Sequence, residues 1–116
     1  MSNIVKRPWG SYLILAKSKI FLIKKIKVNP GGILSYQSHK FRSEHWIIIK
    51  GKAKIIIQNK KYIRKANENI FIKKNYRHRV INESKKNELI LIEVQTGKKF
   101  LETDIKRFSD IYGRVL

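Results

Sequence analysis

The sequence predicts an all-β fold, an antiparallel sandwich or barrel formed by a single domain over residues 1–116. β-branched and aromatic residues recur in short runs, and turn residues such as Asn29-Pro30-Gly31-Gly32 and Lys50-Gly51 separate these runs. Many short strands with tight connections are typical of sandwiches and barrels. A chain of 116 residues, of which 42% are hydrophobic, can form one ordinary core and has no room for a second lobe.

Each run is interpreted as one strand, and the strands follow one another closely. In chain order, the expected strands are Tyr12–Ala16, Ile20–Val28, Leu34–His39, Glu44–Ile49, Lys52–Gln58, Tyr62–Arg64, Ile70–Ile72, His78–Asn82 and Leu89–Gln95. The tail has a different pattern, because Ile105, Phe108 and Ile111 recur at helical spacing. This spacing predicts a short C-terminal helix over Asp104–Tyr112, with Asp104 as its N-cap.

Strand alternation places several polar residues on faces that are otherwise apolar. Lys24 is the one charged residue among Ile20, Leu22, Ile26 and Val28, and its side chain either extends to the barrel mouth or points into a polar pocket. In the last predicted strand, two polar residues share a face with two leucines. They form either a buried polar group or a solvated strand end, and they are Glu93 and Gln95.

The formal net charge of +19 raises the question of nucleic-acid binding. The excess is mostly lysine in scattered pairs such as Lys24-Lys25 and Lys60-Lys61, and no aromatic residues interleave with them as in a surface that binds single strands. We therefore interpret the charge as compositional drift and expect no nucleic-acid partner. A field of this sign would still attract small anions.

Composition also bears on the compartment. The longest apolar runs, such as Trp46–Ile49, are far too short to cross a bilayer, so no membrane segment is expected. The chain contains no cysteine, which excludes disulfides and thiolate metal ligands and suits a reducing compartment. Met1–Arg7 has no apolar stretch of the kind found in secretory signals, so we expect a cytoplasmic protein.

Four polar residues have a spacing that suits a metal ion. Gln37 and His39 lie two residues apart and share one face of a strand, Glu44 begins the next strand after a short bend, and His78 begins a third. Two imidazoles, a carboxylate and an amide oxygen suit Zn, Mn, Fe, Co or Ni and leave positions open for water or substrate. The sequence therefore predicts a divalent metal site at these residues. His45 points away from Glu44, so we expect it either to pack against neighbouring residues or to hold one of the metal ligands in position.

The same spacing resembles the first motif of the cupin superfamily, with Gln37 in place of the usual first His and Gly51 at its end, and His78 and Asn82 match the second motif. Further strings resemble the type II mannose-6-phosphate isomerase family: Arg7-Pro8-Trp9-Gly10, Leu34-Ser35-Tyr36-Gln37-Ser38-His39, Arg42-Ser43-Glu44-His45-Trp46, Ile92-Glu93-Val94-Gln95-Thr96-Gly97, and a tail motif with Glu102, Asp104-Ile105, Arg107 and Asp110-Ile111-Tyr112-Gly113-Arg114. The resemblance covers nearly the whole chain. It implies a cupin β-barrel, a double-stranded β-helix of the jelly-roll type.

In that family the domain commonly follows a mannose-1-phosphate guanylyltransferase domain, and no glycine-rich nucleotidyltransferase loop occurs here, so a stand-alone isomerase domain is expected. The resemblance implies interconversion of mannose 6-phosphate and fructose 6-phosphate through an enediolate, in the service of GDP-mannose and polysaccharide biosynthesis. It implies one divalent ion, with zinc the first choice and Mn, Co, Ni or Fe as alternatives. A homodimer formed through outer strands is also expected from the resemblance.

The isomerisation needs a base and a phosphate site. Glu93 is the first candidate for the base and Glu68 is its rival, because Glu44 is expected on the metal. The candidates for phosphate binding are cations near the expected ligands, and each of them can equally be read as a structural cation: Arg79, Arg42 and Lys24.

The sequence departs from the family pattern around the metal site. Lys40-Phe41 replaces a His-rich run, and Lys73 and Asn75 replace the usual Pro and Gly before His78. Asn75 is expected to turn the chain, because Asn adopts positive φ more readily than most residues. These departures motivate an alternative function, a non-catalytic cupin that binds a sugar phosphate or a nucleotide sugar.

Overall fold

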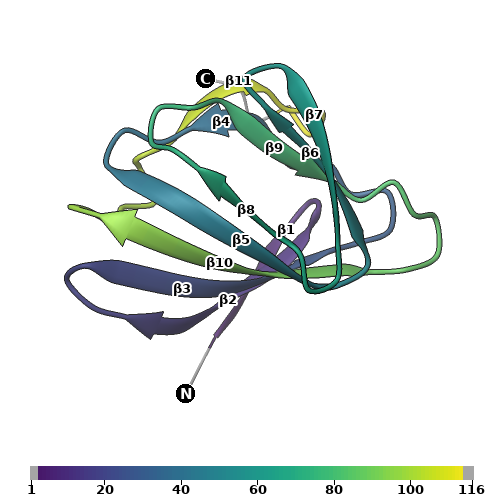
Figure 1. The fold of residues 1–116 in the computed structure, drawn as a ribbon, viewed down its shortest axis with the longest axis horizontal. Helices are drawn as coiled ribbons and strands as arrows, with labels where there is room; N and C mark the ends of the chain where they lie inside the picture. The colour runs from purple at the N-terminus through teal and green to yellow at the C-terminus, as the bar shows by residue number, and fades with distance from the viewer. Residues whose placement is uncertain (1–2, 114–116) are drawn as a thin grey trace.

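The computed structural model describes residues 3–113, and this part of the chain forms eleven strands without an α-helix. The strands form two antiparallel sheets that lie face to face, as Figure 1 shows. The predicted all-β fold is therefore confirmed. No helix within residues 3–113 is long and apolar enough to cross a membrane.

The larger sheet has the strand order β1-β2-β3-β10-β5-β8 and the smaller sheet the order β11-β4-β9-β6-β7. In the larger sheet the bounds are β1 (Ile4–Arg7), β2 (Gly10–Lys17), β3 (Phe21–Val28), β10 (Leu89–Gly97), β5 (Arg42–Lys50) and β8 (Asn69–Ile72). In the smaller sheet they are β11 (Lys106–Ser109), β4 (Tyr36–Ser38), β9 (His78–Ile81), β6 (Lys52–Ile57) and β7 (Lys60–Lys65). Each predicted run overlaps one of these strands, whereas β1 and β11 were not predicted.

Strand β10 shows how the space between the sheets is divided. Its inward side chains are Leu89, Leu91, Glu93 and Gln95, and each is at most 6% exposed. The two leucines belong to the hydrophobic core, which includes Ile48 from the neighbouring β5. Glu93 and Gln95 form a buried polar group, which decides between the two alternatives left by the sequence. The barrel therefore has an apolar end and a polar end.

The loop that leads into β9 is fixed by a left-handed residue. Asn75 has φ 70°, as expected from the sequence, and its backbone N–H donates to the carbonyl of His39 at 2.7 Å. Asn replaces Gly here without loss of the turn. The bond ties the segment before His78 to the segment after β4, so the two histidines are held close together.

Asn82, the last residue of the second motif, is a structural residue at the opposite end of β9. Its side chain is 1% exposed, and its Nδ2 donates to the carbonyls of Val28, Asn29 and Asn87 at 3.1, 3.2 and 2.8 Å. Its Oδ1 accepts from the backbone N–H of Ser84 at 3.2 Å. Asn82 thereby joins the loop that follows β9 to the end of β3 at the apolar end of the barrel.

The prediction of a helix over Asp104–Tyr112 is wrong, because part of this segment forms β11. Strand β11 pairs with β4, with Lys106 opposite Ser38 and Arg107 opposite Gln37. Strand β4 is short and would otherwise leave one edge of the smaller sheet unpaired. Pairing with a strand distant in sequence overrides the weak helical spacing.

Asp104 also differs from its predicted role as an N-cap. Its carboxylate accepts hydrogen bonds from the backbone N–H groups of Lys40 and Phe41 at 2.8 and 3.0 Å. The ring of Phe108 packs edge-on against Tyr36, with centroids 6.2 Å apart. The tail therefore folds against the segment around β4, beside the predicted metal ligands.

Candidate metal centre

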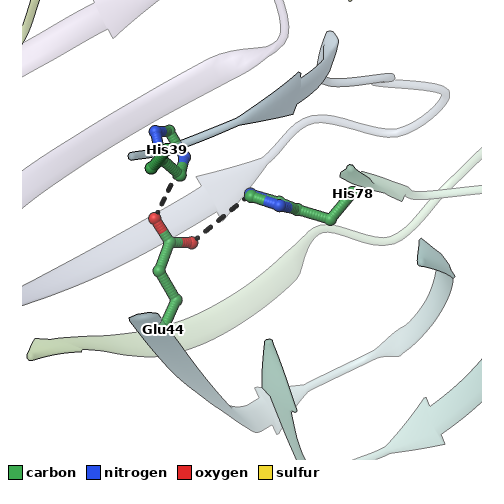
Figure 2. A group of neighbouring side chains, drawn as sticks. All are labelled: His39, Glu44 and His78. Carbon is green, nitrogen blue, oxygen red and sulfur yellow. Dashed lines mark ion pairs between the residues drawn. The ribbon is translucent and has the colours of Figure 1, made fainter. Parts of the chain in front are cut away.

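Two imidazoles and a carboxylate meet between the sheets at the polar end of the barrel (Figure 2). Nε2 of His39 lies 3.2 Å from Oε2 of Glu44, and Nε2 of His78 lies 3.6 Å from Oε1 of Glu44. The candidate ligand atoms all lie within 4.8 Å of one another, and all three side chains are buried. This is a set of nitrogen and oxygen donors that fits a divalent transition-metal ion.

The strand register explains why these residues meet. Gln37 of β4 lies directly opposite His78 of β9, and His39 follows two residues after Gln37. Glu44 reaches the same point from β5 in the other sheet. The structure thus brings all four predicted ligands to the wall of one cavity of about 230 Å³, with Gln37 beside the His/Glu/His group.

Backbone carbonyls orient both imidazoles. Nδ1 of His39 lies 2.7 Å from the carbonyl of Asp104, and Nδ1 of His78 lies 3.0 Å from the carbonyl of Tyr76. Because a carbonyl only accepts, each Nδ1 carries the proton and each Nε2 presents its lone pair towards Glu44. Metal-binding histidines in proteins are commonly held in this way.

The electrostatics give these residues the protonation states of metal ligands. Burial lowers the pKa of His39 to about 4 against the opposing effect of Glu44, and burial also lowers the pKa of His78. Burial alone would raise the pKa of Glu44, but His39 and His78, when protonated at low pH, and the permanent charge of Arg42 hold it well below its ordinary value. At neutral pH both imidazoles are therefore neutral while Glu44 is ionised, as metal binding requires.

Arg42, a candidate for phosphate binding, lies within this group instead of apart from it. Its Nε donates to Oε2 of Glu44 at 2.9 Å, and its Nη2 lies 3.2 Å from Nε2 of His39. The side chain is 10% exposed. Arg42 therefore neutralises the carboxylate of Glu44. It also binds the Oε2 atom of Glu44 and the Nε2 atom of His39, which a metal ion or a substrate would also contact.

A second carboxyl group lies next to the candidate metal centre. Nε1 of Trp46 donates to Oε1 of Glu44 at 3.0 Å and to Oε1 of Glu93 at 3.2 Å, while Nε2 of Gln95 donates to Oε2 of Glu93 at 2.7 Å. Burial, together with the charge of Glu44, raises the pKa of Glu93 to about 8. Glu93 is thus a buried acid that changes protonation near neutral pH.

The other predicted site residues lie in different places. Lys24 lines the cavity, with its Nζ 3.9 Å from Oε1 of Glu102 and 4.1 Å from the centre of the Tyr12 ring, so it points into the pocket. Glu68 does not line this cavity. It is exposed and accepts a hydrogen bond from the backbone N–H of Lys65 at 2.6 Å.

Arg79 and His45 do not line the cavity either. Residues alternate along β9, so Arg79 faces away from His78, and its guanidinium donates to the carbonyls of Leu34 and Ser109 at 3.0 and 3.2 Å. His45 pairs with Asn69, at 2.9 Å between Nε2 and Oδ1, on the side of β5 opposite Glu44, as expected.

The sequence interpretation missed several residues of the cavity wall. Trp46 and Arg107 were read only as parts of family motifs, and Tyr12 was not considered as a site residue at all. Arg107 faces the cavity from β11, which the sequence interpretation had assigned to a helix. Lys106–Ser109 has no clear alternation of polar and apolar residues, so no local signal marks Arg107 as a residue that faces the cavity.

Two facing antiparallel sheets with a buried His/Glu/His group at one end define the chain as a cupin with a candidate metal centre. The fold is similar to that of an RmlC-like cupin from Shewanella frigidimarina NCIMB 400, with a TM-score of 0.73 and 15% identity over 83% of this chain and 84% of that chain.

The chain belongs to the family described as "Mannose-6-phosphate isomerase C-terminal", whose model matches residues 1–110. It is 42% identical over 110 residues to the alginate biosynthesis protein AlgA of Pseudomonas syringae pv. tomato, covering 95% of this chain and 23% of the relative. It is 44% identical over 110 residues to a mannose-1-phosphate guanylyltransferase of Salmonella montevideo, with the same coverage of 95% and 23%. The chain thus spans less than a quarter of the length of these relatives.

Proposed function

We propose that this chain is a metal-dependent sugar-phosphate isomerase that interconverts mannose 6-phosphate and fructose 6-phosphate. Membership of the family supports the reaction class. The observation on which the proposal depends is that Glu93, a buried carboxyl group whose pKa is raised to about 8, shares the indole N–H of Trp46 with the candidate metal ligand Glu44. A proton-transfer group and a metal site are thereby combined in one cavity.

His39, Glu44 and His78 would hold the metal ion, with Gln37 as a fourth ligand. When bound, a divalent ion would stabilise the negative charge that develops on the substrate oxygens at C1 and C2. The donors fit zinc, and Mn, Co, Ni and Fe accept the same set of two imidazoles with carboxylate and amide oxygens.

Glu93 would move the proton between the carbons. Its ionised carboxylate would take the proton from C2 of the open-chain aldose, which leaves an enediolate, and would return it to C1. A second proton passes from the C2 oxygen to the C1 oxygen, so that the aldehyde becomes an alcohol and the C2 alcohol a ketone. Gln95 and Trp46 would hold the Glu93 carboxyl group in position through their N–H donors.

The biological setting is part of the proposal. The relatives are named for alginate biosynthesis and for mannose-1-phosphate guanylyl transfer, and this supports a role in the supply of GDP-mannose for polysaccharides. The absence of cysteine suits the cytoplasm, in which we place the enzyme. The homodimer stays a prediction, and light scattering of the purified protein tests it.

A coupled assay tests the proposal. The protein is loaded in turn with Zn, Mn, Co, Ni and Fe, metal content is measured, and mannose 6-phosphate is supplied with an enzyme system that detects fructose 6-phosphate. We expect turnover with at least one ion and a loss of about 100-fold or more in kcat for Glu93→Gln at unchanged metal content. Glu83→Gln, at an exposed position, is the control and should keep full activity. No conversion with any ion at full occupancy would overturn the proposal.

A second candidate function is a non-catalytic cupin that binds a sugar phosphate or a nucleotide sugar. The observation that favours it is Arg42, whose guanidinium already binds both His39 and Glu44 and so competes with a metal ion for these donors. Calorimetry that shows binding of a sugar phosphate, together with no turnover in the loaded protein, would support this function. Turnover would exclude it.

A further inference from the structure

Strand β11 places an arginine in the same row of the smaller sheet as two predicted metal ligands. Arg107 lies opposite Gln37 in the pairing of β11 with β4, and Gln37 lies opposite His78 in the pairing of β4 with β9. Neighbouring strands are about 4.8 Å apart, so the backbones of Arg107 and His78 are separated by roughly 10 Å. All three side chains line the same cavity.

The guanidinium of Arg107 has hydrogen-bonding capacity that the protein does not use. Its Nε is buried and has no hydrogen-bond partner among residues 3–113. Within the same part of the chain, no carboxylate lies within ion-pair distance of Arg107, whereas Arg42 pairs with Glu44 and Lys24 with Glu102. A buried donor without an acceptor is costly, and an anionic ligand in the cavity would supply that acceptor.

We infer that Arg107 binds the phosphate group of the substrate, a hexose 6-phosphate in its open-chain form. This inference rests on the proposed function, because the C1–C2 end of the sugar would then lie at the metal centre while the chain extends across Gln37 to β11. A planar guanidinium can donate two parallel hydrogen bonds to a phosphate, and it stays charged at every working pH. Binding at this distant end would hold the reacting carbons in place.

The other cations near the site are less suited to this role. Arg79 donates to two backbone carbonyls and does not line the cavity. Arg42 is bound to Glu44 and His39, at the end where the metal ion would lie. Lys24 lies close to Glu102 and above the ring of Tyr12, so its charge is already partly balanced. Arg107 thus replaces Arg79, Arg42 and Lys24 as the candidate for the phosphate.

Calorimetry with an inert ligand tests the inference. Sorbitol 6-phosphate is an open-chain hexitol phosphate without a carbonyl group, and it is titrated into the zinc-loaded protein alongside sorbitol, which lacks the phosphate. We expect Arg107→Gln to weaken binding of sorbitol 6-phosphate by about 10- to 100-fold and Arg107→Lys to weaken it less, because lysine keeps the charge without the paired donors.

Lys106→Gln is the matched control, since Lys106 is exposed on the same strand and its loss removes the same charge. It should change the affinity by no more than about threefold, as a screened surface charge does. Zinc affinity, measured for every variant, should stay unchanged. Equal binding of sorbitol 6-phosphate by wild type, Arg107→Lys and Arg107→Gln would overturn the inference, as would equal binding of sorbitol and its phosphate. If Arg107→Gln does not fold, Arg107→Lys decides.

The outcomes separate this inference from the proposed function. Binding of sorbitol 6-phosphate that depends on Arg107, in a protein without isomerase turnover, supports the anion site and excludes the isomerase. Turnover of mannose 6-phosphate with an unchanged KM in Arg107→Gln supports the isomerase and excludes the role of Arg107.

Discussion

Replacement of Glu93 by Gln should stabilise the metal-free protein at alkaline pH and leave it nearly unchanged at about pH 5. The structure buries this carboxyl group beside the charge of Glu44. Desolvation is the main reason, and the charge of Glu44 the second, why its pKa rises from the ordinary 4.5 to about 8. A group whose pKa is raised on folding stabilises the folded state fully below its unfolded pKa, and this stabilisation is lost as the pH rises through the folded value.

The two pKa values of Glu93 define the size of the effect. At 1.36 kcal/mol per pKa unit, the difference between 4.5 and about 8 corresponds to a loss of up to roughly 5 kcal/mol in the free energy of unfolding, most of it between about pH 5 and pH 8. Glutamine has no proton to lose over this range. Its amide oxygen can still accept from Trp46, and its amide nitrogen can donate to Gln95 once the amide of Gln95 turns round to present its oxygen.

The assay is urea unfolding at about pH 5, 7 and 9 in the presence of a chelator, for wild type, Glu93→Gln and Glu83→Gln. Glu83 is exposed beside Lys54, so its replacement should change the unfolding free energy by the same small amount at every pH. The advantage of Glu93→Gln should grow with pH and approach its full value by about pH 9. A difference between wild type and Glu93→Gln that is the same at all three pH values would refute the reasoning.

Three further predictions concern the metal site and the loops. His39→Ala should weaken zinc binding by more than about 100-fold, since even the loss of a residue that only orients a ligand costs 10- to 100-fold, whereas His45→Ala should leave it unchanged in calorimetric titration. Asn82→Ala should lower the free energy of unfolding by roughly 2–4 kcal/mol in urea, because buried carbonyls lose their donor, and an equally stable Asn82→Asp variant would contradict this account, since Asp lacks the same donor. At Asn75, with φ 70°, Gly should be tolerated and Val should cost about 1–2 kcal/mol; equal melting temperatures for the two variants would contradict it.

Much of the fold could be predicted because its strands alternate strictly. In β10 the order Leu89, Leu91, Glu93, Gln95 on one face identifies the inward residues and marks where the core gives way to a polar cavity. The candidate ligands could be predicted for a related reason. Gln37, His39 and Glu44 are close in sequence, and the strands that carry them pair so that their side chains line the same cavity.

The strand in the tail and the position of Arg107 could not be predicted, because they depend on contacts between distant segments that local sequence patterns do not contain. The tail has a helical spacing, yet the open edge of β4 draws Lys106–Ser109 into a strand, and Arg107 reaches the cavity only through that pairing. Arg42 was expected to bind phosphate because it is close to the ligands in sequence, and the structure shows that the same closeness turns it towards Glu44. For Arg79, strand alternation alone would have been sufficient to place the side chain outside the cavity, because Arg79 directly follows His78, which faces inward.

Trp46 is an intrinsic fluorophore in the wall of the cavity that holds the candidate metal ligands. Its indole N–H touches both Glu44 and Glu93, and its ring lies edge-on to His78 with centroids 5.6 Å apart. The chain has only two tryptophans, and the other, Trp9, lines the same cavity. Intrinsic fluorescence should therefore respond to the arrival of an ion, to the loss of the Glu93 proton and to the entry of a sugar, so each event can be followed in the unlabelled protein in real time.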